Sequence, residues 1–81
     1  MSNNFKGFAL FNDVEDQDLR TYNRARVLSN IFEDHSKDAK ITPKGAAVFL
    51  GYFQQVPEQE RAIVQQKFVS LMAERGFRIA A

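Results

Sequence analysis

The sequence predicts an all-α fold, in which residues 1–81 form one domain of three helices. The first indication is the almost uninterrupted apolar run of residues 45–53, which Pro43 and Pro57 bracket. The second is a pair of flanking segments whose apolar residues recur every three or four positions, as on one face of a helix. The third is length, because a chain of 81 residues can enclose only one core.

The composition of the chain excludes several classes of protein. The net charge is +1 and no cysteine is present, which excludes disulfides, thiolate catalysis and cysteine-held metal sites. The apolar run is shorter than the roughly 20 residues of a membrane span. The start of the chain has no basic, apolar signal pattern. We therefore expect a cytoplasmic protein without cofactor or membrane association.

The first helix is predicted over residues 13–34. Asn12 or Asp13 can accept hydrogen bonds from the first-turn amides, and Asn12 with Glu15 has the spacing of a capping box. Acidic residues come first and arginines follow, in agreement with the helix dipole. The predicted core stripe consists of Thr21, Ala25, Leu28 and Phe32, flanked by Tyr22 and Ile31.

The second helix is predicted over residues 43–55, after a polar loop at residues 35–40. Thr42 suits the N-cap, and Pro43 suits the first helical position because its missing amide is not needed there. Ala47 and Gly51 lie four residues apart, which would allow a neighbouring helix to approach closely. A helix that is apolar on every side should be buried, so we expect this one to be central.

The third helix is predicted over residues 57–75. Pro57 opens it in the same way, and its stripe runs through Arg61, Val64, Phe68, Leu71 and Met72. Gly76 is expected to end it in a left-handed conformation, with Phe77 packing back on the last turn. The short connection makes the second and third helices spatial neighbours.

The two ends of the chain are predicted to be extended. Residues 5–11 are apolar and aromatic, and residues 76–80 offer a second short apolar segment. Two such segments could form a minimal two-stranded pairing that lies on the helices.

Catalysis is poorly supported by the residues. His35 is the single histidine, and the neighbouring Glu33, Asp34 and Asp38 would allow an acid–base or metal role. A histidine after a helix end is also favoured there by the dipole alone, and we take that interpretation. The acids of residues 13–18 lack the central glycine of a calcium loop. We expect neither an enzyme nor a metal site.

The leading functional hypothesis is a small, non-enzymatic regulatory or accessory protein, of bacterial or phage type, that acts by contacting a protein partner. The chain has more apolar groups at its ends than three short helices need, and exposed aromatics are typical interface anchors. The same groups could instead close the core, and association with a second copy is also left open. The candidate contact residues are Phe5, Phe8, Phe11, Arg20, Arg24 and Arg26.

The alternative is a nucleic-acid-binding module. It would use the three arginines with nearby aromatic, amide and lysine side chains, namely Tyr22, Asn23, Lys37, Lys40 and Lys44. On a helical wheel, however, Arg26 lies apart from Arg20 and Arg24. A helix-turn-helix formed by the second and third helices is disfavoured, because Glu58 and Glu60 at the start of the third would repel phosphates.

Overall fold

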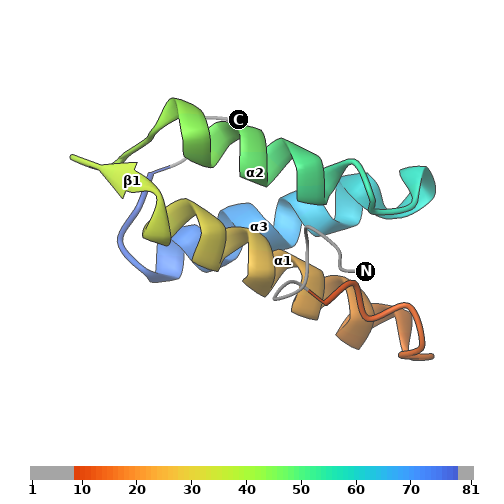
Figure 1. Cartoon of the computed structure of the whole chain (residues 1–81). Coiled ribbons are helices and arrows are strands. Elements are labelled where there is room, and N and C mark those ends of the chain that lie inside the picture. Colours follow the sequence, from red (N-terminus) through yellow and green to blue (C-terminus); the bar gives the residue numbers. More distant parts are fainter. Residues whose placement is uncertain (1–8, 79–81) are drawn as a thin grey trace.

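The computed structural model describes residues 9–78 and confirms a three-helix domain. Helix α1 (Gln17–Asp34) is followed by a short hairpin, β1 (Ser36–Lys37) and β2 (Lys40–Ile41), and by helix α2 (Pro43–Phe53). A 3-10 turn, η1 (Glu58–Glu60), then leads into helix α3 (Arg61–Glu74). Figure 1 shows α2 running along one side of α1 while α3 crosses α1 on another.

The central helix is α1, so the prediction that α2 would be central is wrong. α1 packs against both other helices, and its contact with α3 is the most extensive in the domain. In α2 only Gly45 and Tyr52 are buried, and Leu50 keeps 54% of its surface exposed. The physical reason is that α1 has a continuous buried stripe to offer to two neighbours, whereas α2 is covered on one side only.

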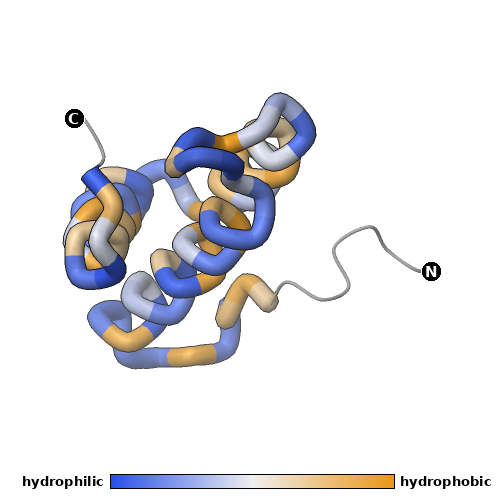
Figure 2. The backbone as a smooth tube through the Cα atoms, turned by 90° about the vertical axis from the view of Figure 1, so that its left-hand side faces the viewer, coloured by the Kyte–Doolittle hydropathy of each residue, from blue (hydrophilic) through white to orange (hydrophobic). Residues whose placement is uncertain are grey.

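The core lies along α1 and consists of residues from every helix. Its buried hydrophobic members are Ala25, Leu28, Ile31, Tyr52, Val56, Val64, Phe68, Leu71 and Met72. The predicted stripes of α1 and α3 are confirmed in most positions, but Phe32 and Arg61 are only half-buried. Among the flanking residues of α1, Ile31 is buried and Tyr22 is exposed. Figure 2 shows hydrophobic and hydrophilic residues alternating along the helices, as amphipathic packing requires.

Aromatic rings join the three helices at one end of this core. The rings of Phe49 on α2 and Phe68 on α3 meet edge to face with their centroids 5.1 Å apart. Phe32 of α1 lies 6.2 Å from Phe68 and 5.7 Å from Phe77. α2 and α3 are therefore neighbours, as predicted, through long side chains rather than through a close approach of their backbones.

α1 begins four residues later than the predicted residue 13, at Gln17. The N-cap is Asp16, whose carboxylate accepts from the amides of Asp18 and Leu19. The predicted caps, Asn12 and Asp13, both precede the helix, and Asn12 instead accepts a hydrogen bond from Arg24. The sequence prediction thus missed Asp16, although aspartate is a favoured N-cap residue.

The predicted polar loop after α1 contains an antiparallel hairpin in which Ser36 pairs with Ile41 and Lys37 with Lys40. Its two turn residues, Asp38 and Ala39, have φ values of 56° and 65°. Positive φ at both positions is the condition for the tight turns that join two-residue hairpins. Neither residue is glycine, which is why the sequence gives no strong hairpin signal here.

The starts and ends of the later helices mostly follow the sequence. Thr42 is the N-cap of α2 and accepts from the amide of Gly45, as predicted. Residues 58–60 form a 3-10 turn instead of the first α-helical turn of the third helix. Gly76 has a φ of 93° and ends α3, and the amide of Phe77 donates to Met72 O at 2.9 Å. The predicted left-handed cap is therefore confirmed.

The predicted pairing of the terminal segments depends largely on residues 1–8 and 79–81, which lie outside the described residues. Across residues 9–78, no helix has both the length and the apolar character that crossing a lipid bilayer requires.

Candidate functional site

Arg24 is built into the fold and does not reach the surface. Its exposed fraction is 1%, and its guanidinium forms an ion pair with Glu60 of η1. Arg24 Nε donates to Leu10 O at 2.8 Å, and Nη2 donates to Asn12 Oδ1 at 3.0 Å. Each of the three guanidinium nitrogens of Arg24, proposed as a contact to a partner or a nucleic acid, therefore has a partner inside the domain, and the side chain is not exposed for such a contact.

Arg20 binds the other oxygen of the same carboxylate. Its Nη2 lies 2.7 Å from Glu60 Oε2, and its Nη1 donates to Val14 O at 2.6 Å. The hydrogen bond from Arg20 is the largest cause that holds the pKa of Glu60 below its usual value, and burial opposes it. Reciprocally, the hydrogen bond to Glu60 raises the pKa of Arg20. Arg20 thus mainly holds the N-terminal segment and η1 against α1.

Tyr52 completes the attachment of the N-terminal segment. Its ring is fully buried, and its hydroxyl donates to Ala9 O at 2.6 Å. Burial raises the pKa of Tyr52 to about 12, because the phenolate would lose its hydration, while the charge of Arg24 acts in the opposite direction. Arg24 and Tyr52 together bind the carbonyls of Ala9 and Leu10. The segment is therefore fixed by one side chain of α1 and one of α2.

Arg26 is exposed, as is expected of a contact residue. Leu19 and Tyr22 precede it by seven and four positions, so the three side chains lie on one face of α1. Leu19 is 49% exposed and Tyr22 is 41% exposed. We call these three residues the α1 outer face. Sequence reasoning missed Leu19, although its place off the buried stripe of Thr21, Ala25 and Leu28 could have revealed it.

A hollow of about 410 Å³ adjoins this face, between α1 and α3. Tyr22 and Leu71 supply its apolar lining, together with the polar residues Asp18, Gln66, Lys67, Ser70 and Glu74. Lys67 Nζ binds both the carboxylate of Asp18 at 2.5 Å and its carbonyl oxygen at 3.0 Å. Apolar and charged groups therefore meet beside Tyr22.

A second depression is entirely apolar. It encloses about 270 Å³ and is lined by Phe32, Ile41, Ala46, Phe49, Leu50 and Phe68. We call it the α2 groove. Residues 46, 49 and 50 lie on one face of α2, and the other lining residues come from the end of α1, β2 and α3. These four elements therefore surround a depression whose lining residues have no polar side chain.

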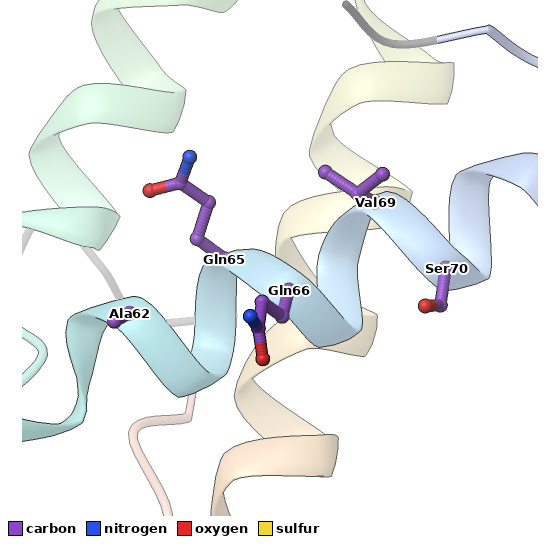
Figure 3. Close-up of a pocket in the computed structure, with 5 residues that line it drawn as sticks. All are labelled: Ala62, Gln65, Gln66, Val69 and Ser70. Carbon is purple, nitrogen blue, oxygen red and sulfur yellow. The ribbon is translucent and has the colours of Figure 1, made fainter. Parts of the chain in front are cut away.

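A third hollow, of about 560 Å³, lies on α3. Figure 3 shows its lining residues, with Gln65 and Val69 on one side of the helix and Gln66 and Ser70 on another. All five, including Ala62, come from this one helix and are uncharged. Among the described elements no second one closes the hollow, so it has no convergent set of polar groups with which to hold a ligand.

His35 has a structural position. It is the residue that follows α1, and its Nδ1 lies 3.0 Å from Ile31 O. Its Cβ lies so close to Gly45 that a side chain at position 45 would overlap it. Within residues 9–78 no group of three or more acidic or histidine side chains could hold a metal ion. The ring of His35 contacts the backbone of α1.

Of the aromatic contact candidates, Phe5 and Phe8 lie outside the described residues. Phe11 is half-buried with a φ of 61°, and its carbonyl accepts from the amide of Val14 at 3.1 Å. Phe11 therefore shapes the turn that leads toward α1. The lysines of the nucleic-acid alternative, Lys37, Lys40 and Lys44, are exposed on the hairpin and at the start of α2.

The chain was compared with protein-family models, with curated proteins and with solved structures. No family model matches it, and neither a curated protein nor a solved structure matches it.

Proposed function

We propose that this chain is a small, non-enzymatic regulatory or accessory protein of bacterial or phage type, which acts in the cytoplasm by contacting a protein partner through the α1 outer face. The observation that carries the proposal is the exposure of Leu19 and Tyr22 beside Arg26 on one helix. Single exposed apolar residues are ordinary, but a leucine, a tyrosine and an arginine on one face combine apolar area with the residue types found at interface hot spots.

The chemistry of this face specifies its partner. Leu19 and Tyr22 would fit an apolar depression, and Arg26, which has no ion pair within residues 9–78, would pair with a carboxylate. The partner is therefore a protein surface with an acidic group at the edge of an apolar patch. The neighbouring hollow between α1 and α3 adds room for a side chain from that partner next to Tyr22.

Affinity capture from cells of the native host tests this proposal. The double variant Tyr22→Ala with Arg26→Ala should capture at least about tenfold less of the partner protein than the parent chain, because it lacks two hot-spot side chains. Both side chains are exposed, so the variant should keep the thermal stability of the parent. The captured protein is then purified, and its direct binding to parent and variant is compared by calorimetry.

The matched control is Leu50→Ala, which removes an equally exposed apolar side chain from α2. It should capture the same protein as the parent. If the double variant captures the same protein as the parent in the same amount, the proposal is contradicted.

Nucleic-acid binding is placed second, because Arg20 and Arg24 are engaged with Glu60. It would depend on Arg26 and on the exposed lysines, and it predicts an affinity that falls steeply with salt. A mobility-shift titration at low salt that shows no binding would end this alternative.

A further inference from the structure

Residues 9–13 precede α1 and are attached to it through their oxygen atoms; we call them the N-terminal strap. Arg24 of α1 donates from Nε to Leu10 O at 2.8 Å and from Nη2 to Asn12 Oδ1 at 3.0 Å. Among residues 9–78, no backbone–backbone hydrogen bond joins the strap to a helix. The strap is therefore held by side chains and is not part of a hydrogen-bonded helix or sheet.

α2 supplies a second attachment of the strap. The hydroxyl of Tyr52 donates to Ala9 O at 2.6 Å, and Leu10 packs against the hydrophobic core while only partly buried. Ala9, Asn12 and Asp13 are exposed. Segments with few buried apolar contacts open at a lower free energy than the core of the same domain. The strap has the properties of such a segment.

The backbone of the strap favours its release. Phe11 has a φ of 61°, a left-handed conformation that is disfavoured for a residue with a bulky side chain. The Phe11 carbonyl accepts from the amide of Val14 at 3.1 Å, so this conformation belongs to the turn at the end of the strap. When the strap leaves the domain, Phe11 can return to a relaxed φ, and this gain offsets part of the lost contacts.

The charge of Arg24 stays neutralised when the strap opens. Arg24 is ion-paired with Glu60, and Arg20 binds the other oxygen of that carboxylate. Opening therefore exchanges only the strap for water at Nε and Nη2 of Arg24. Arg20 also donates to Val14 O at 2.6 Å, directly after the strap. The contact between α1 and η1 thus remains in place, and the strap has a fixed pivot.

We propose that the N-terminal strap opens and closes as one unit over Arg24 and Tyr52 while the three helices stay folded. The closed strap covers the hydrogen-bond donors of these two side chains, and the open strap presents them to an acceptor of another molecule. Arg24 is therefore available as a contact residue in the open form only. This device shares no residue with the α1 outer face, so it goes beyond the proposed function and is independent of it.

Hydrogen exchange of the full chain, followed by NMR, tests the proposal. The Nε–H of Arg24 reports on the strap, because its bond to Leu10 O must break before the hydrogen exchanges. The amides of Leu28 and Met72, inside α1 and α3, report on global unfolding. The opening constant at Arg24 Nε–H, taken relative to the exchange of an exposed guanidinium, should exceed that of the two amides by about 100-fold or more.

Urea separates the two kinds of opening in the parent chain. Opening of the strap exposes little surface, whereas global unfolding exposes the core, and the effect of urea scales with the exposed surface. Low urea concentrations should therefore accelerate exchange at the amide of Leu28 and leave exchange at Arg24 Nε–H nearly unchanged. Equal effects of urea at both groups would show that the strap opens only when the domain unfolds, which would overturn the proposal.

Tyr52→Phe loosens the strap from the side of α2. The substitution keeps the buried ring and removes the hydroxyl that donates to Ala9 O. Exchange at Arg24 Nε–H should become about fivefold faster, which is the effect of losing one ordinary hydrogen bond. An unchanged rate would overturn the proposal, because the bonds of Tyr52 and Arg24 would then not open together.

Ile31→Val is the matched control, because Ile31 is 1% exposed in the core and lies seven positions after Arg24, roughly 10 Å along α1. This conservative change should accelerate exchange at the amides of Leu28 and Met72 by about 2- to 10-fold. It should leave exchange at Arg24 Nε–H unchanged, since strap opening does not break the core. Equal acceleration at all three groups would overturn the proposal.

Discussion

At the scale of single residues, the turn of the hairpin stores backbone strain. Asp38 and Ala39 both have positive φ, a region in which side chains with a Cβ are disfavoured by about 1–2 kcal/mol per residue. Aspartate tolerates this region because its short side chain can bond locally, but alanine has no such compensation. The strain is therefore concentrated at Ala39.

Ala39→Gly should stabilise the domain by about 0.5–1 kcal/mol. The change removes the left-handed strain, and this gain is partly offset by the greater entropy of glycine in the unfolded chain. Urea unfolding followed by circular dichroism measures the difference.

The control is Ala47→Gly, at an exposed position inside α2, where the same change should cost about 1 kcal/mol. Opposite signs for the two substitutions are expected. A loss of stability at position 39 would mean that the turn does not require positive φ there.

At the scale of elements, the contact between α1 and η1 depends on one carboxylate shared by two arginines. Glu60 binds Arg20 and Arg24, and Arg24 also holds the segment before α1 through Leu10 O and Asn12. Removing the acid would leave a buried guanidinium without its counterion, which is more costly than losing an exposed ion pair. This cluster thus couples three pieces of chain that are distant in sequence.

Glu60→Gln should lower the free energy of unfolding by about 3 kcal/mol at neutral pH. The pKa of Glu60 lies below its usual value of 4.5 in the folded state, so its charge stabilises the fold above that value. This contribution is lost as the pH falls through the depressed pKa. The stability difference between parent and variant should therefore shrink in acid, as measured by urea titrations at several pH values.

Glu58→Gln is the control, since Glu58 lies in the same 3-10 turn, is exposed, and has no ion pair within residues 9–78. It should change the stability by less than about 0.5 kcal/mol at any pH. A difference between parent and Glu60→Gln that stays constant down to about pH 3 would contradict the assigned role.

At the scale of the whole molecule, the decisive feature is that α1 and not α2 occupies the centre. Ala25, Leu28 and Ile31 of α1 are almost fully buried, whereas α2 exposes Leu50. A chain of 81 residues has a free energy of unfolding of roughly 4–12 kcal/mol, so one central side chain contributes a large share.

Leu28→Ala should cost about 2–5 kcal/mol, because it opens a cavity at a site that is 1% exposed. Leu50→Ala should cost about 1 kcal/mol or less, because its side chain is already half in water. Calorimetric unfolding of both variants measures the contrast. Equal costs for the two leucines would contradict a central α1.

The sequence by itself determined the class of fold, the number of helices and most of their ends. The helix ends at Thr42, Pro43 and Gly76 depend on the neighbouring backbone, so local patterns predicted them. The buried stripe of α3 is periodic in the sequence and was predicted in the same way. On a helical wheel Arg26 lies apart from Arg20 and Arg24, so its exposure was also predictable. These features depend on interactions between residues only a few positions apart.

The tertiary structure alone decided which helix is central and what the arginines do. Arg24 and Glu60 lie 36 positions apart, and Tyr52 and Ala9 lie 43 apart, so no periodic pattern relates them. An arginine on a helix looks the same in sequence whether it meets a partner or a buried carboxylate. The apolar character of α2 indicated burial on every side, but the packing covers this helix on one side only, because burial depends on what lies opposite each face.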